Sequence, residues 1–145
     1  MKKKFSHRAK RYKEKIDYAR DRISDLEDWL YAEDIKERKT FFASEKSFQE
    51  VVECLADVFS MIISDLNLSV NDDYSNIDKL KEKNILSEEN ASVCIEANGL
   101  RNRVVHRYNH TDEKRFIESS RELIPKLVKV FDDVEYYLKN FKNGR

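Results

Sequence analysis

The sequence contains very little of the two residues that most often interrupt regular structure, with two glycines and one proline among 145 residues. Folds rich in tight turns, such as β-sandwiches and barrels, need such residues at many positions. Charged residues instead make up 39% of the chain and hydrophobic residues 40%, which is typical of helices that bury one face. We therefore expect an all-α protein, and this length fits one compact domain spanning residues 1–145.

Cysteine is also scarce, and long apolar runs are absent. Cys54 and Cys94 lie far apart in the chain, each among apolar neighbours, so we interpret them as buried free thiols rather than as a disulfide pair. The basic start of the chain lacks the apolar stretch that a secretory signal requires, and no segment approaches transmembrane length. These absences predict a soluble cytoplasmic protein that does not associate with membranes.

The chain also carries no formal net charge, because 28 Lys and Arg balance 28 Asp and Glu. Any binding of an anion must therefore arise from local segregation of charge. Such segregation occurs in Asn98–Tyr108, which holds three arginines, a histidine and a tyrosine without a carboxylate. Met1–Lys15 is basic too, with Glu14 as its only acid. We interpret this start as a solvated end, with added electrostatic affinity for an anionic partner as the alternative.

Apolar residues recur at intervals of three and four through most of the chain, a pattern that indicates amphipathic helices. The first predicted helix covers Lys10–Tyr31. A second runs from about Ser44, or slightly earlier, to Leu66, and its apolar face is broad enough to predict contacts with more than one neighbour. Phe41 and Phe42 precede this helix and are expected to close the turn between the two.

Three further helices are predicted in the second half of the chain, beginning after a polar stretch. Asn67–Asn76 is expected to be the longest loop, followed by a short helix that ends near Lys83. Ser87 is typical of a helix N-cap because two acids follow it in the first turn. The helix that it opens carries Asn98–Tyr108 at its C-terminal end. Its apolar stripe consists of Val93, Ala97, Leu100 and Val104.

The last predicted helix follows the polar stretch and extends past Leu138. Thr111 or Asp112 can cap its start. Pro125 falls inside the run, and because proline cannot donate the helical hydrogen bond, it predicts a kink or an earlier break. The sequence indicates no strand, no internal repeat and no second domain.

Helical geometry decides which side chains of the polar stretch can meet. Arg101 and Tyr108 fall near one stripe of the helix, whereas Asn102 and His106 follow another at an interval of four. Arg101 and His106 are five residues apart, roughly 140° around an ideal helix. They converge only if the arginine wraps around the helix, the helix distorts, or a second copy brings its own motif alongside. Gly99 favours the last option, because a missing side chain lets another helix approach closely.

Arg101-Asn-Arg-Val-Val-His-Arg-Tyr108 resembles the R-x-x-x-x-H-x-Y motif of HEPN-domain proteins. The preceding Ala97-Asn-Gly-Leu100 is similar to the HepT-type toxins in particular. The order of the elements also matches, from the long first helix to a final helix with a proline after Glu-Leu-Ile, so the likeness covers nearly the whole chain. The resemblance implies a HEPN-type up-and-down bundle of about five helices that forms a dimer.

The activity that this resemblance implies is that of a metal-independent ribonuclease without a cofactor, the toxin of a toxin–antitoxin pair. The active form would be a homodimer whose two motifs line one cleft. His106 can take the proton of an RNA 2′-hydroxyl, and Arg101 can stabilise the charge that develops at phosphorus. Asn102 can orient His106 or hold a phosphate oxygen. Arg103 and Arg107 are expected to bind RNA, either a transfer RNA or a messenger RNA.

Control by a second protein is also implied. In this family a cognate nucleotidyltransferase of the MNT type (MntA-type) acts as the antitoxin and attaches AMP to the motif tyrosine, which is Tyr108 here. Each added phosphate would bring negative charge beside the arginines that RNA needs. The expected partners are therefore RNA, a second copy of the chain and an MNT-domain nucleotidyltransferase.

Other interpretations of the same residues stay open. Arg101 and Arg103 also fit ion pairs with acids of neighbouring helices, which is the usual role of a helical arginine. Tyr108 fits a core position as well. His106 and His110 have the spacing of a helical metal pair, but no suitable cysteine or acid pair accompanies them, so we expect no zinc site. The alternative function is a catalytically silent HEPN module that binds a nucleotidyltransferase partner or nucleic acid.

Overall fold

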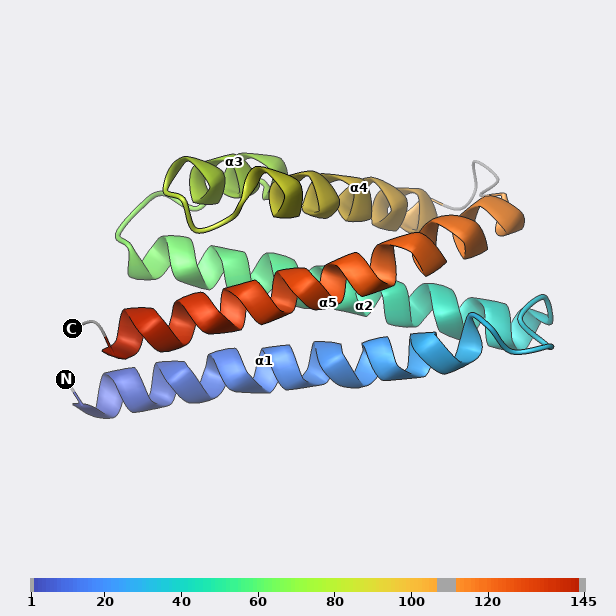
Figure 1. Cartoon of the computed structure of the whole chain (residues 1–145), viewed down its shortest axis with the longest axis horizontal. Helices are drawn as coiled ribbons and strands as arrows, with labels where there is room; N and C mark the ends of the chain where they lie inside the picture. Colours follow the sequence, from blue (N-terminus) through green and yellow to red (C-terminus); the bar gives the residue numbers. More distant parts are fainter. Residues whose placement is uncertain (1, 107–111, 144–145) are drawn as a thin grey trace.

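The computed structural model describes residues 2–106 and 112–143, which fold into five α-helices and no strand (Figure 1). The helices are α1 (Lys2–Trp29), α2 (Arg38–Asp65), α3 (Asp73–Glu82), α4 (Glu88–Val105) and α5 (Glu113–Asn143). The predicted all-α bundle of about five helices is confirmed. None of the helices in the described part of the chain is both long and apolar enough to cross a bilayer.

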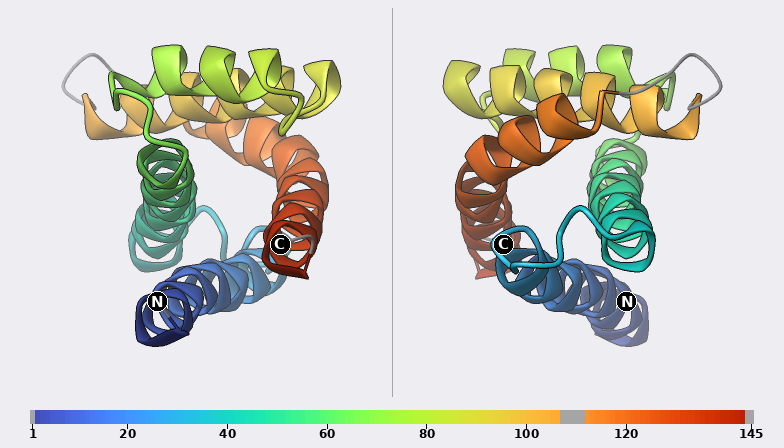
Figure 2. Two further views of the ribbon diagram at one scale, coloured as in Figure 1. Left: turned by 90° about the vertical axis from the view of Figure 1, so that its left-hand side faces the viewer. Right: turned by 90° about the vertical axis from the view of Figure 1, so that its right-hand side faces the viewer.

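The five helices form three layers (Figures 1 and 2). α1 is one outer layer, α2 and α5 form the middle layer, and α3 with α4 covers the opposite side of that pair. The contacts agree, since α1 and α4 each pack against both α2 and α5. The C-terminal end of α4 lies at the end of the bundle away from the start of α1 and the end of α5 (Figure 1). The described residues of the motif, Arg101–His106, are therefore presented at one end of the molecule.

α1 contributes one apolar stripe to the core, as its periodicity predicts. The stripe consists of Ile16, Ala19, Ile23 and Leu26, and Leu30 extends it just after the end of α1; all are at most 3% exposed. The helix begins at Lys2 rather than at the predicted Lys10. Contacts with the end of α2 hold this additional length, because Arg8 pairs with Asp65 at 2.8 Å and the Tyr12 hydroxyl donates to the same carboxylate at 2.6 Å.

α2 begins at Arg38, so the expectation that Phe41 and Phe42 close a turn before the helix is wrong. Phe41 lies in the first turn of α2 and is buried. Its ring meets the edge of Phe116 of α5, with the centroids 5.6 Å apart. This packing with α5 outweighs the weak local preference of aromatic residues for a non-helical conformation. The broad apolar face of α2 contacts α1, α3 and α4, as predicted.

Side-chain caps start the two short helices. Ser87 Oγ accepts a hydrogen bond from the Asn90 backbone N–H at 3.0 Å, which confirms the predicted cap of α4. Asp72 Oδ1 accepts from the Ser75 backbone N–H at 2.9 Å, so α3 starts inside the stretch that was predicted to be a loop up to Asn76. α3 is followed by Asn84 at a φ of 61°, a left-handed conformation that asparagine tolerates better than most residues.

α5 is continuous from Glu113 to Asn143 and passes through Pro125. The predicted earlier break is therefore wrong, although the helix bends along its length (Figure 2). Packing offsets the hydrogen bond that proline removes, because the apolar residues on both sides of it are buried. These residues are Leu123, Ile124 and Leu127. Asp112 caps the start by accepting from the Lys114 backbone N–H at 3.0 Å, whereas Thr111 lies outside the described residues.

The two cysteines are free thiols, as predicted. Cys94 is buried, and burial raises the pKa of its thiol to about 12. Cys54 is only half-buried, so it is less enclosed than expected, and burial raises its pKa as well. Thiols with raised pKa values are poor nucleophiles near neutral pH, which is consistent with a packing role.

Candidate functional site

The apolar residues of α4 determine where its polar residues point. Leu100 and Val104 enter the core and are 1% and 5% exposed. Arg101 and Asn102, which lie beside this buried stripe, are consequently half-buried at the edge of the helix. The fold therefore holds the first two residues of the motif between α4 and its neighbour α2.

His106 lies where α4 ends. Its φ and ψ of −99° and 46° make it the C-cap, and its backbone N–H donates to the Asn102 carbonyl at 3.0 Å. The imidazole is exposed, as is Arg103 in the last turn of the helix. A histidine at this position is fixed through its backbone by the helix and open to solvent through its ring, which suits a group that exchanges protons with a substrate.

Arg101 is joined to α2 by an ion pair. Its Nη2 donates to Glu53 Oε2 at 2.8 Å, and its Nη1 donates to Asn102 Oδ1 at 3.0 Å. Glu53 also accepts a hydrogen bond from Gln49 Nε2 at 3.3 Å. Asn102 thus contacts Arg101 through its side chain and His106 through its backbone carbonyl, so one asparagine links the two catalytic candidates.

The charge of Glu53 is stabilised by these contacts. Partial burial alone raises the pKa of a carboxyl, but the hydrogen bonds from Arg101 and Gln49 outweigh it and lower the pKa of Glu53 below its usual range. Glu53 therefore stays ionised and holds the guanidinium in one orientation.

The guanidinium of Arg101 retains donors for an anion. Two of its five N–H groups are used by Glu53 and Asn102. The Nε–H is buried and has no acceptor among the described residues. One N–H on each terminal nitrogen remains, and two such donors suit bidentate binding of phosphate oxygens.

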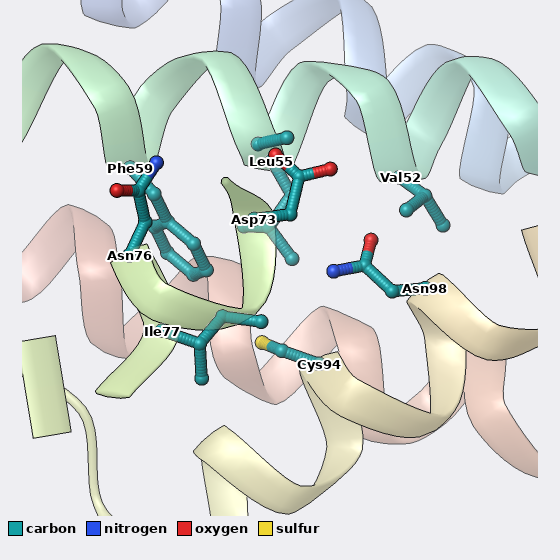
Figure 3. Close-up of a pocket in the computed structure, with 9 residues that line it drawn as sticks. Val52, Leu55, Phe59, Asp73, Asn76, Ile77, Cys94 and Asn98 are labelled. Carbon is teal, nitrogen blue, oxygen red and sulfur yellow. The ribbon is translucent and has the colours of Figure 1, made fainter. Parts of the chain in front are cut away.

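A pocket of about 380 Å³ opens between α2, the start of α3 and α4, beside Arg101. We call it the α2–α4 pocket. Val52 and Ala56 form its apolar side, and the other lining residues are Glu53, Asp57, Asp73, Asn98 and Arg101. An inner recess of about 10 Å³ continues towards Cys94 (Figure 3), which is about the space of one water molecule.

The outward face of α4 is partly apolar. Ile95 and Val105 are 43% and 44% exposed. A Cβ atom added to Gly99, between them in sequence, would meet nothing within 4 Å. The glycine is therefore not required by packing within the described part of one chain, although glycine costs about 1 kcal/mol relative to alanine in a helix.

Two predicted site residues, Arg107 and Tyr108, lie outside the described residues, as does His110. Among the residues that are described, no group of three or more His, Cys, Asp or Glu side chains is arranged to hold a metal ion.

Glu53, Asp73 and Asn98 were not among the residues selected from the sequence as functional. Glu53 is separated from Arg101 by 48 positions, and nothing in the sequence pairs the two. The one available signal is the series Glu45, Gln49 and Glu53, which repeats at intervals of four along the flank of the apolar face of α2.

An all-α bundle with an arginine, an asparagine and a histidine at the end of one helix fits the HEPN class of helical ribonuclease domains. The family model described as "Ribonuclease HepT-like" matches residues 14–134. The chain therefore belongs to the HepT-like ribonuclease family.

Two relatives agree with this assignment, and a solved structure agrees with the fold. Two Archaeoglobus fulgidus proteins, each named "Putative RNase", are 31% and 35% identical to this chain. The matches cover 86% and 93% of this chain and 96% and 98% of theirs. The cytosolic protein of unknown function YutE from Bacillus subtilis superposes with a TM-score of 0.81 over 94% of each chain at 12% identity, which supports the fold alone.

Proposed function

We propose that this protein is a metal-independent endoribonuclease that cuts RNA by attack of a ribose 2′-hydroxyl on the adjacent phosphate. The observation that carries the proposal is the guanidinium of Arg101, which Glu53 and Asn102 orient beside a pocket with two N–H donors left for an anion. Preorganised donors of this kind stabilise charge that develops in a transition state.

The proposed reaction needs one base and one acid. His106 takes the proton from the 2′-hydroxyl, the 2′-oxygen bonds to phosphorus, and the bond from phosphorus to the 5′-oxygen breaks. The leaving 5′-oxygen accepts a proton, so the products are a 2′,3′-cyclic phosphate and a 5′-hydroxyl. Arg101 stabilises the additional charge on the phosphorane, and Arg103 with Arg107 binds neighbouring phosphates.

A single histidine serves poorly as both base and acid in one step. We propose that the second of these two groups comes from a second copy of the chain. This copy would pack against the outward face of α4, where Ile95 and Val105 are exposed and Gly99 leaves room for a close helix. Packing of a second helix at Gly99 would explain why a glycine occupies this helical position despite its cost.

The dimer can be tested at Gly99. Because the site is open, Gly99→Leu is compatible with the fold of one chain, but it would obstruct a close helix. We expect the wild type to sediment as a dimer and the variant as a monomer with cleavage reduced at least about tenfold. Unchanged thermal unfolding would exclude misfolding. A monomeric wild type that cleaves RNA would contradict the shared site.

Cleavage itself is tested with the purified protein on single-stranded RNA. His106→Ala should lower the rate by a factor on the order of 100 or more, and EDTA should have no effect. His7→Ala is the matched control and should cleave as the wild type does. Full activity in His106→Ala, or dependence on added metal, would reject the mechanism.

We also propose that the protein is the toxin of a pair controlled by an MNT-domain nucleotidyltransferase. The basis is the motif sequence, in which Tyr108 follows His106 by two residues. AMP attached to Tyr108 would place negative charge next to the motif arginines and repel the RNA backbone. Incubation with the partner and ATP should add AMP to the wild type and stop cleavage, and Tyr108→Phe should prevent both effects. A label on another residue, found by mass spectrometry, would disprove the assignment.

A further inference from the structure

We propose that the α2–α4 pocket binds the base of a nucleotide next to the cleaved phosphate and selects guanine. This inference rests on the proposed ribonuclease function and adds to it a substrate preference. It concerns Asn98 and Asp73, neither of which belongs to the R-x-x-x-x-H-x-Y motif.

Asn98 is the first observation. Its side chain is 6% exposed and makes no hydrogen bond to any described residue. Figure 3 shows its amide directed from α4 into the space between α2 and the start of α3. Without a protein partner among the described residues, this amide faces the pocket and is available to bind what enters it. A ligand that both donates and accepts hydrogen bonds, as the edge of a base does, would satisfy it.

Asp73 is the second observation. It is the first residue of α3, and its carboxylate makes no hydrogen bond or ion pair with the described residues. The other two acids of the pocket are already engaged, since Glu53 holds Arg101 and Asp57 pairs with Lys15 at 3.2 Å. Asp73 is therefore the acid of the pocket that remains available to accept a hydrogen bond from a ligand.

The pocket is lined by groups of opposite charge, and this combination indicates the ligand. Arg101 offers donors to an anion, whereas Asp73 repels anions and accepts only from donors. Val52 and Ala56 provide an apolar surface that a flat ring can cover. A group with a phosphate at one end and a planar, donor-bearing ring at the other is a nucleotide. The volume of about 380 Å³ is within the range of small-ligand pockets, roughly 300–1,000 Å³.

The chemistry of the carboxylate selects among the four bases. Single-stranded RNA is commonly read through the Watson–Crick edges of its bases. Guanine presents two adjacent N–H donors on that edge, which match the two oxygens of Asp73, and its carbonyl O6 can accept from the Asn98 amide. Adenine and cytosine offer one amino group each. Uracil has one N–H between two carbonyl oxygens, and a carboxylate repels those oxygens. We therefore expect guanine to be the preferred base and uracil to be the least favoured.

The test uses RNA oligonucleotides that are identical except for the nucleotides on either side of one cleavage site. We expect the wild type to prefer guanine at one fixed side of the cut. Replacing that guanine by inosine removes only the 2-amino group, and should lower kcat/KM about tenfold, as expected for the loss of part of a bidentate contact. This arm of the experiment needs no change in the protein and is independent of folding.

Asp73→Asn tests the assignment to the pocket. Asparagine keeps the size of the side chain but offers a donor in place of one acceptor oxygen, so the variant should cleave the guanine and inosine substrates equally. Asp78→Asn is the matched control, because Asp78 is exposed on the same helix and does not line the pocket. It should retain the preference of the wild type.

The outcomes separate the two proposals. If no RNA is cleaved, the proposed function fails and this inference fails with it. If cleavage depends on His106 but all four bases are equivalent, uracil is preferred, or inosine is cleaved as well as guanine, only the base pocket is rejected. A guanine preference that persists unchanged in Asp73→Asn would place base recognition elsewhere and overturn the inference.

Discussion

Two arginines each join a pair of helices in this protein, and their partners differ. Arg20 of α1 pairs with two carboxylates of α5, Asp132 at 3.0 Å and Glu135 at 2.6 Å. Arg101 of α4 pairs with the single carboxylate Glu53 and with the neutral amide of Asn102. Arg20 thus faces two carboxylates, whereas Arg101 faces one and lies at a pocket.

This difference distinguishes a structural arginine from one suited to catalysis. The sequence alone favoured an ordinary ion pair for any helical arginine, and Arg20 has that role. Arg101 has an ion pair as well, so pairing with an acid does not exclude a role in binding an anion. The distinguishing features are the number of carboxylates and the open space beside the guanidinium. Four predictions use this contrast.

The largest expected effect is on cleavage of RNA by the two arginine variants. Arg101→Ala should lower kcat/KM by a factor on the order of 100 or more, because it removes the donors for the phosphorane. Arg20→Ala should remain within about twofold of the wild type, because charges that are far from the reacting phosphate are screened. Equal losses in both variants, measured on the same RNA, would show that Arg101 acts through stability alone.

A smaller effect is expected when the carboxylate partners are neutralised. Glu53→Gln should lower kcat several-fold to about tenfold, because Arg101 is held less firmly, and it should lower KM, because a negative charge near the phosphate is removed. Glu135→Gln removes a partner of Arg20 and should change neither constant. A fall of kcat in Glu53→Gln with an unchanged KM would argue that Glu53 does not face the bound RNA.

The loss of folding stability should be larger for Arg20→Ala than for Arg101→Ala, which is the reverse of their order in the loss of activity. Arg20→Ala leaves Asp132 and Glu135 close together without their cation, and should reduce the free energy of unfolding by about 1 kcal/mol. Arg101→Ala should cost less, because it also removes an Nε–H that is buried without an acceptor in the described part of the chain. Urea unfolding of the two variants, followed by circular dichroism, measures this ranking. A larger loss of unfolding free energy in Arg101→Ala than in Arg20→Ala would contradict this prediction.

The smallest effect concerns pH. Since contacts with Arg101 and Gln49 lower the pKa of Glu53, its ionised form contributes stability that is present above the unfolded pKa of about 4.3. That contribution is lost as pH falls below this value and through the lower folded pKa. The difference in unfolding free energy between wild type and Glu53→Gln should therefore shrink as the pH is lowered below 4.3. A difference independent of pH would show that the charge of Glu53 is immaterial.

Most of the fold could be predicted from the sequence, because amphipathic periodicity and caps are local signals. The buried stripe of α1, the Ser87 cap and the order of the helices were all predicted correctly. The start of α2 and the continuity of α5 were not. Phe41 is helical because it packs against Phe116, and α5 continues through Pro125 because buried residues flank it. Both outcomes depend on distant segments that local propensity does not include.

By itself, the sequence determined the helical fold and the motif Arg101–Tyr108, because periodicity and motif spacing are properties of neighbouring residues. Only the tertiary structure decided that Glu53 and Asn102 hold Arg101, that the Asn98 side chain has no partner among the described residues, and that Asp73 lines the same pocket. These residues come from three helices and are far apart along the chain. Helix packing brings them within hydrogen-bond distance of one another or around one opening, and the chemical environment of a side chain is set by that packing.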